Sequence, residues 1–124
     1  SSSGSIAALQ NILNELEGGA GALCFATGMA AISSTLLSLL KAGDHIIVSQ
    51  YLFGNTRCFV DTLADLGIQV SFADVTSIED VQALYQPNTR IVFSETVANP
   101  ATQVADVQAI SQFCREKSLL FIIV

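Results

Sequence analysis

The stretch CFATGMAAI (residues 24–32) joins an apolar run to small helix-forming residues through the corner Thr27-Gly28-Met29. The N–H groups in the first turn of a helix have no partner within that helix, and the helix dipole adds partial positive charge there. A phosphate group fits such a corner, and the Thr27 hydroxyl could bond it as well. The spacing matches neither the P-loop nor the GxGxxG motif. A close-packed strand–helix turn explains the same residues, so both interpretations stay open.

A second loop, SQYLFGNT (residues 49–56), carries two aromatic side chains, Tyr51 and Phe53, directly after another apolar run. An aromatic face at the end of a strand can stack on a flat ligand. Both side chains would serve equally well as ordinary core aromatics. The Gly54-Asn55 pair permits a tight turn before the next helix.

A third loop begins with ETVANP (residues 95–100), in which a carboxylate, Glu95, leaves an apolar run. Pro100 favours an extended conformation at Asn99. The Asn99 amide could then bond a ligand oxygen. The alternative is a common Asn-Pro turn that starts the next helix.

Five apolar runs alternate along the chain with five helical patterns. We expect strands at 21–27, 45–49, 68–74, 89–95 and 119–124, and helices at 5–17, 28–40, 55–67, 77–85 and 104–118. Ser77 is the expected N-cap of its helix, with Asp80 in the capping-box position. Because the strands are apolar throughout, the pattern predicts an α/β fold: a three-layer, mostly parallel sheet with helices on both faces.

Ligands of parallel sheets bind at the carboxyl ends of the strands. The loops expected at that edge are 26–29, 49–56, 74–77 and 94–103, which include all the candidate residues above. The other candidates look structural. A lone His45 opens a strand, and the sequence contains no evident Ser/His/Asp set or metal-ligand cluster.

The composition excludes several classes of protein. The 124 residues suit one domain, are 51% hydrophobic and carry a net charge of −6, with five Lys and Arg spread along the chain. Nucleic-acid binding is therefore not expected, and no apolar run is long enough to span a bilayer. The three cysteines are odd in number and widely spaced, which resembles no disulfide or metal framework. We expect a cytoplasmic protein.

The ordered set of segments LEGGAGALCFATGMAAI, LLKAGDHIIVS, FGNT, ETVANP and LLFIIV resembles one family. It is the Cys/Met-metabolism family of pyridoxal 5'-phosphate (PLP) enzymes, which includes cystathionine γ-synthase, cystathionine lyases, methionine γ-lyase and O-acylhomoserine sulfhydrylases. The resemblance covers nearly the whole chain. It implies that residues 1–124 are the central part of a PLP-binding large domain, of the aspartate-aminotransferase-like type of fold.

The resemblance also implies a role for each candidate residue. Gly28 and Met29 would give N–H groups to the cofactor phosphate, with Thr27 in the place of the family's usual Ser. Phe53 would stack on the pyridine ring. Asn99 would bond the phenolic oxygen of that ring.

Glu95 would help to hold the loop near the cofactor. Phe53 stands where the family most often has Tyr, and Asn55 stands where methionine γ-lyases usually carry Cys. These two departures favour γ-replacement on an O-acylhomoserine, with sulfide or cysteine as the second substrate. A C–S lyase is the alternative within the family, and a stand-alone phosphate- or nucleotide-binding module is the alternative outside it.

The family's pyridine-pairing Asp and Schiff-base Lys would follow Val124, so we expect no catalysis from this chain alone. Lys41 and Lys117 lie outside the loops that would face the ring. Members of the family are usually homotetramers built from close dimers, and the same assembly is expected of the parent enzyme.

Overall fold

The computed structural model describes residues 22–25, 29–52, 54–95 and 100–123 of the chain. The predicted helix over 5–17 lies outside the described residues. The elements run in the order β1 (Ala22–Phe25), α2 (Met29–Leu39), β2 (His45–Ser49), α3 (Gly54–Asp65), β3 (Gln69–Ala73), α4 (Ile78–Leu84), β4 (Thr89–Ser94), α5 (Pro100–Glu116) and β5 (Leu120–Ile123). The predicted alternation of strand and helix is confirmed over this range.

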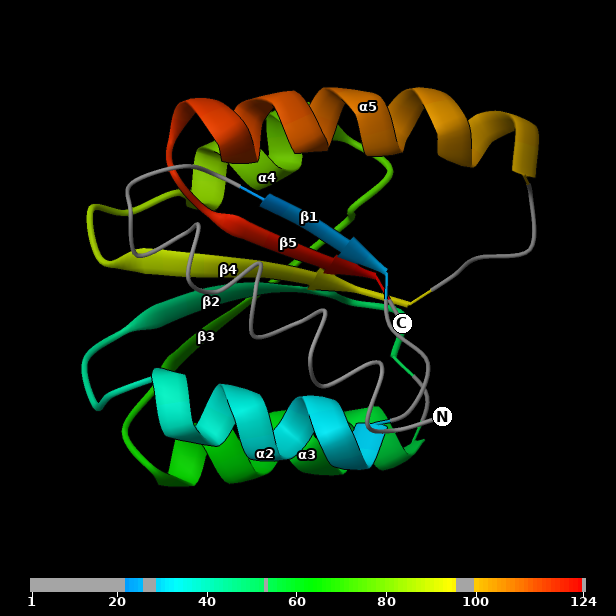
Figure 1. The fold of residues 1–124 in the computed structure, drawn as a ribbon. Coiled ribbons are helices and arrows are strands. Elements are labelled where there is room, and N and C mark those ends of the chain that lie inside the picture. The colour runs from blue at the N-terminus through cyan, green and yellow to red at the C-terminus, as the bar shows by residue number, and fades with distance from the viewer. Residues whose placement is uncertain (1–21, 26–28, 53, 96–99, 124) are drawn as a thin grey trace.

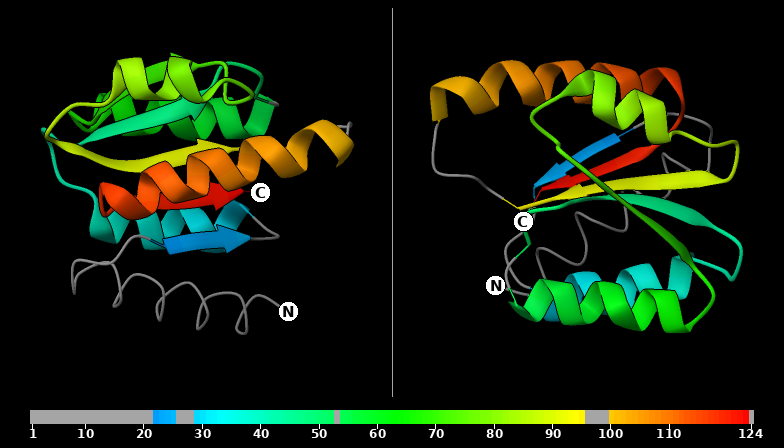
Figure 2. Two further views of the ribbon diagram at one scale, coloured as in Figure 1. Left: turned by 90° about the horizontal axis from the view of Figure 1, so that it is seen from above. Right: turned by 180° about the vertical axis from the view of Figure 1, so that it is seen from behind.

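The five strands form one parallel sheet in the order β1-β5-β4-β2-β3. Helices α2 and α3 cover one face of the sheet and α4 and α5 cover the other (Figures 1 and 2). The predicted three-layer α/β architecture is therefore confirmed. Every carboxyl end of a strand points to the same edge, which we call the carboxyl edge; the opposite edge is the amino edge (Figure 1).

Two apolar clusters hold the layers together, one on each face of the sheet. Successive residues of a strand point to opposite faces, so Ile46 and Val48 of β2 pack with α2 and α3, whereas Ile47 packs with α4 and α5. The neighbouring strands β4 and β5 alternate in the same way. Because β2, β4 and β5 are buried on both faces, they contain almost no polar residues between their ends.

Strand β3 corrects the expectation that every strand is apolar throughout. It pairs with β2 alone and forms one edge of the sheet, and of its residues only Ala73 is fully buried. Phe72 is 39% exposed, and the Arg57 guanidinium lies 4.4 Å from the centre of its ring. That cation–π contact covers part of an aromatic side chain that the edge position leaves in solvent.

The ends of two helices follow local rules. Gly67 ends the α3 segment, as predicted, with a φ of +86° that favours glycine. Ser77 is the N-cap of α4 and accepts a hydrogen bond from the Asp80 N–H, as predicted. The Asp80 carboxylate does not close the capping box on Ser77; it accepts instead from the N–H of Asp74, at 2.9 Å.

Helix α5 begins at Pro100, four residues before the predicted start at residue 104. Proline suits the first position of a helix, because the N–H that it lacks would have no partner within the helix. The polar residues that follow Pro100 suggested a loop, but they form the first turn of α5. Helix α3 likewise begins at Gly54, one residue earlier than predicted.

Candidate functional site at the carboxyl edge

The ends of β2 and β4 bring buried polar groups together at the carboxyl edge. The two strands are neighbours, with Val48 opposite Phe93, so the serines that follow, Ser49 and Ser94, end adjacent strands. Both serines are buried, and so is the carboxylate-bearing Glu95, which is 7% exposed. Polar groups are costly to bury, so three of them at one sheet edge indicate a built polar site rather than a continuation of the core.

Hydrogen bonds fix the chain where it leaves these strands. The Ser49 hydroxyl accepts from the N–H of Tyr51 at 3.1 Å, and the Ser94 hydroxyl donates to the carbonyl of Glu95 at 3.1 Å. The Tyr51 side chain is 64% exposed. The interpretation of Tyr51 as a core aromatic is therefore wrong, and this aromatic side chain lies in solvent at the carboxyl edge.

Helices α2, α3 and α5 begin at this same edge (Figure 1), and none of them has an acidic residue in its first turn. Their partial positive charge therefore remains available to an anion from outside. Helix α4 differs, because Glu79 and Asp80 lie in its first turn and Ser77 caps it. Three of the four described helices are thus suited to an anionic ligand, and the fourth has acidic side chains of its own.

The predicted site residues fall into two groups. Met29 is the first residue of α2, and Glu95 directly follows β4; both lie at the carboxyl edge, as the sequence predicted. Thr27, Gly28, Phe53 and Asn99 lie outside the described residues. In sequence, they are next to the starts of α2, α3 and α5.

The two lysines that the sequence analysis set aside lie at the amino edge. Lys41 belongs to the turn between α2 and β2, where its N–H bonds the Asp44 carboxylate at 2.9 Å. Lys117 lies between α5 and β5, with its Nζ 5.1 Å from the centre of the Tyr85 ring. Neither can reach a ligand at the carboxyl edge, so their exclusion is confirmed.

The possible metal ligands and the cysteine thiols are further features of the described residues. Among the described residues, no group of three or more His, Cys, Asp or Glu could hold a metal ion. Cys58 is exposed and Cys114 is buried, and both thiols are free. Burial raises the pKa of Cys114 to about 12, so this thiol remains protonated and unreactive at neutral pH.

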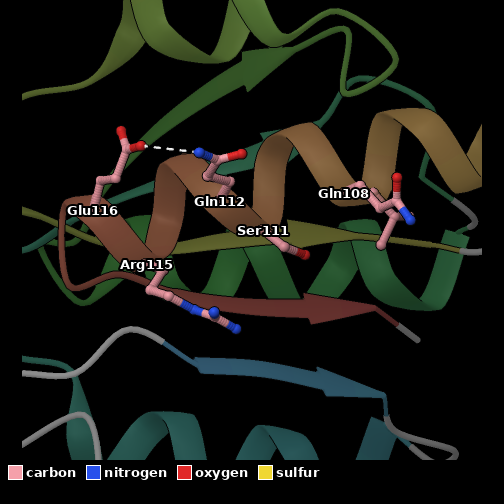
Figure 3. Close-up of a pocket in the computed structure, with 6 residues that line it drawn as sticks. Gln108, Ser111, Gln112, Arg115 and Glu116 are labelled. Carbon is pink, nitrogen blue, oxygen red and sulfur yellow. Dashed lines mark hydrogen bonds between the residues drawn. The ribbon is translucent and has the colours of Figure 1, made fainter.

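A hollow of about 520 Å³ lies along the C-terminal part of α5 (Figure 3). The described side chains that line it all belong to that helix: Val107, Gln108, Ser111, Gln112, Arg115 and Glu116. The buried Ser111 hydroxyl has no hydrogen-bond partner among the residues that the structure describes. Because α5 begins at the carboxyl edge and this hollow follows its far half, the hollow is separate from the candidate site.

The structure also assembles a group of residues that the sequence analysis missed. The two ring nitrogens of His45 lie 2.6 Å from the Thr89 hydroxyl and 2.7 Å from the Ser71 hydroxyl. The arrangement resembles a nucleophile–base–orienter set, but Thr89 supplies no negative charge and His45 is fully buried at the amino edge. We therefore assign it a structural role. Ser71 and Thr89 lie 26 and 44 positions after His45 in the sequence, so residue spacing could not have predicted this group.

Comparison with known proteins shows the family to which the chain belongs. The family model described as Cys/Met metabolism PLP-dependent enzyme matches residues 3–124. The chain belongs to this family. For the candidate site at the carboxyl edge, the match therefore favours a part of a PLP enzyme over a stand-alone nucleotide-binding module.

Individual relatives agree with the family. The chain is 42% identical over 120 residues to an O-acetyl-L-homoserine sulfhydrylase of Corynebacterium glutamicum, covering 95% of this chain and 28% of that protein. It is 37% identical over 117 residues to an L-methionine gamma-lyase of Fusobacterium nucleatum, covering 94% of this chain and 30% of that protein. The chain therefore spans less than a third of the length of these relatives.

A solved structure of the family has the same fold. It is an O-acetylhomoserine sulfhydrylase of Wolinella succinogenes, with a TM-score of 0.67 and 39% identity, covering 78% of this chain and 29% of that one. The relatives include both replacement enzymes and lyases, so their names do not decide between the two kinds of reaction. None of the helices that the structure describes is long and apolar enough to cross a membrane.

The described residues fit the phosphate of PLP in one specific respect. Helix α2 begins at Met29 with the small residues Ala30 and Ala31 next and no carboxylate in the first turn. A phosphate dianion needs N–H donors and an environment free of negative charge. The first turn of α2 offers such N–H donors and carries no acidic residue of its own.

Proposed function

We propose that residues 1–124 are part of the PLP-binding large domain of an enzyme of sulfur amino-acid metabolism. The observation that carries the proposal is the common origin of α2, α3 and α5 at the carboxyl edge, each without an acidic residue in its first turn. The family match over 3–124 supports the same conclusion from the sequence.

The site residues of the proposal are those of the family resemblance. Backbone N–H groups of Gly28 and Met29 bind the cofactor phosphate, and the Thr27 hydroxyl adds a further bond. Phe53 stacks on the pyridine ring, and Asn99 bonds the phenolic oxygen. The position of Met29 at the start of α2 supports the first of these roles.

Glu95 completes the set. A buried carboxylate at the end of β4 suits a group that holds its own loop in place. Two loops of the proposed site thus leave adjacent strands, since Phe53 follows β2 and Asn99 follows β4. Bound PLP supplies an electron sink for the substrate carbanion; the protein binds and orients it.

The proposed reaction is γ-replacement on an O-acylhomoserine by sulfide or cysteine. The sulfhydrylase relatives from two organisms support it, as do Phe53 in the place of the usual Tyr and Asn55 in the place of the methionine γ-lyase Cys. A C–S lyase remains the second candidate, because an L-methionine gamma-lyase is also among the relatives.

The reaction is tested with the full-length protein that contains this chain, loaded with PLP. O-acetylhomoserine and sulfide should yield homocysteine, whereas methionine or cystathionine alone should yield little 2-oxobutyrate and ammonia. Faster release of 2-oxobutyrate from methionine than formation of homocysteine would replace the proposed reaction by the lyase.

Phe53 and Tyr51 offer a matched pair of variants, because they are two aromatic residues in one connection. We expect Phe53→Leu to weaken PLP binding by about two- to twelvefold, since a stacked aromatic pair contributes about 0.5–1.5 kcal/mol beyond its buried area. The exposed Tyr51, replaced by Leu, should leave PLP binding unchanged. Equal effects of the two substitutions would contradict the role of Phe53.

We further propose a cytoplasmic homotetramer built from close dimers, as the family resemblance implies. The exposed and unpaired thiol of Cys58 supports a reducing compartment. Sedimentation of the full-length protein tests the assembly, and a monomer would contradict it.

A further inference from the structure

His45 connects three strands of the sheet at the amino edge. It is the first residue of β2, and its side chain is fully buried. One ring nitrogen, Nδ1, lies 2.6 Å from the hydroxyl of Thr89, the first residue of β4. The other, Nε2, lies 2.7 Å from the hydroxyl of Ser71 in β3. The imidazole therefore links β3 to β4 across the strand between them.

An irregularity in the sheet brings Thr89 beside His45. Along β2 and β4 the residue pairs are His45 with Thr89 and then Ile46 with Ile91, so Arg90 is one extra residue in β4. A bulge of this kind re-aims the side chains on one side of it. With a regular register, Arg90 would lie opposite His45 and Thr89 would point to the other face of the sheet.

A further bond fixes the Thr89 hydroxyl from the other side. It accepts from the Gln86 N–H at 2.8 Å, in the turn that precedes β4. Ser71 is only partly buried and lies in β3, which pairs with β2 alone. The Thr89 hydroxyl is therefore held by Gln86 as well as by His45, whereas Ser71 belongs to the edge strand, which is easier to displace.

The surroundings suit a neutral ring. A neutral imidazole donates from one nitrogen and accepts at the other, and a hydroxyl can serve either need. Burial lowers the pKa of His45 below its usual 6.5. Ionisable side chains on the adjoining turns, on β4 and at the amino-edge end of α5 are Lys41, Asp44, Tyr85, Arg90, Arg115, Glu116 and Lys117.

None of these side chains forms an ion pair with His45 in the described part of the chain, where the ion pair found is Arg57–Asp61. The Asp44 carboxylate instead accepts from the Lys41 N–H. A charged ring would have two donors facing two hydroxyls and no carboxylate to balance it, and an unpaired buried charge is costly. Contact with water is the remaining way to stabilise it, and the partly exposed edge strand β3 lies on that side.

We propose that Ser71, His45 and Thr89 form an acid-sensitive clamp that holds edge strand β3 to β2 and β4 while the imidazole is neutral, and releases β3 when the imidazole is protonated. This inference goes beyond the proposed function and does not depend on PLP. It predicts a specific direction: the unfolded chain takes up the proton near pH 6.5, whereas the folded chain resists it, so stability is complete above pH 6.5 and declines below it. The decline ends once the folded form is protonated as well.

The test uses the full-length protein that contains this chain, labelled with ¹⁵N-histidine, in which the imidazole signal of His45 is assigned through the backbone amides of His45 and Ile46. The ring should titrate below pH 6.5 and be one tautomer while it is neutral. The equilibrium constant for opening of the β3 amides, from hydrogen exchange corrected for the intrinsic rate, should rise as the pH falls from 7 to 5, by up to tenfold per pH unit. The β5 amides in the same sample are the internal control and should change less.

His45→Gln removes the titrating group and should remove this pH dependence. If that variant fails to fold, the imidazole signal of the unmodified protein still decides. Titration of the ring at its ordinary pH near 6.5, or opening of β3 that does not change between pH 7 and pH 5, would overturn the clamp. A rise of equal size in β3 and β5 would also overturn it, because the release would then be global.

Discussion

Two glycines at the amino edge allow the cost of backbone strain to be separated from the cost of a steric contact. Gly43 and Gly67 both have positive φ, +93° and +86°, and the Gly43 N–H donates to the Gly67 carbonyl at 2.9 Å. A Cβ built on Gly43 would meet nothing within 4 Å, whereas one built on Gly67 would lie 3.1 Å from the Cβ of Ala42. Alanine at either position suffers the same strain, but alanine at position 67 also collides with Ala42.

The magnitudes follow from these two terms. A residue with a Cβ in the left-handed region costs about 1–2 kcal/mol, which is the loss expected for Gly43→Ala. Gly67→Ala should lose the same amount and roughly 1 kcal/mol more, since overpacking typically costs about 1–3 kcal/mol and Ala42 lies in a turn that can shift slightly. We therefore expect losses of about 1–2 kcal/mol at position 43 and about 2–3 kcal/mol at position 67.

The assay is urea denaturation of both variants, of Ala42→Gly and of the double variant with Gly67→Ala. Removing the Ala42 methyl group should recover the extra loss, so the coupling energy of the double-mutant cycle should be about 1 kcal/mol. Equal losses at the two glycines, or a coupling energy near zero, would refute the steric part of the reasoning. An unchanged stability of Gly43→Ala would refute the conformational part.

Two further predictions concern the cap of α4 and the cysteines. Ser77→Ala removes the acceptor of the Asp80 N–H and should lower the free energy of unfolding by about 1 kcal/mol, measured by urea denaturation; a change of less than a few tenths would show that another group replaces the cap. At pH 8 in the folded protein, the exposed Cys58 should react with iodoacetamide, whereas Cys114, with its pKa raised to about 12, should react only after denaturation. Peptide mass spectrometry distinguishes the two thiols, and early labelling of Cys114 would contradict its burial.

Local patterns in the sequence were sufficient for most of the elements. HIIVS is a strand over His45–Ser49 as predicted, and the Ser77 cap is at its expected place. These features depend on neighbours within a few residues. Apolar runs and cap residues report such neighbours directly.

The features that were missed depend on residues far apart in the chain. The exposure of β3 follows from its place at the edge of the order β1-β5-β4-β2-β3, and no local pattern specifies that order. The Ser71–His45–Thr89 chain needs three strands and a bulge to form. The early start of α5 was missed because Pro100 can be either a loop residue or the first residue of a helix.

The candidate site shows both situations. The sequence placed Met29 in the first turn of a helix and Glu95 at the end of a strand. In the structure Met29 is the first residue of α2 and Glu95 directly follows β4. The common edge of the three loops followed from the predicted parallel sheet, and the structure confirms that α2, α3 and α5 begin there. The first turn of α5 was not predicted, because the helix was expected to begin at residue 104 instead of Pro100.

The central claim is that the start of α2 binds the phosphate of PLP, and the most direct measurement compares the dissociation constants of PLP and of pyridoxal, which lacks the phosphate, for the full-length protein. Met29→Pro removes one N–H donor at a position where proline is compatible with a helix, and Met29→Leu is its matched control. Since a hydrogen bond to a charged group contributes about 1.5–3 kcal/mol, Met29→Pro should weaken PLP binding by roughly tenfold or more, with pyridoxal binding unchanged and Met29→Leu normal for both. Equal affinities for PLP and pyridoxal in the unmodified protein, or an equal loss of both in Met29→Pro, would contradict the claim.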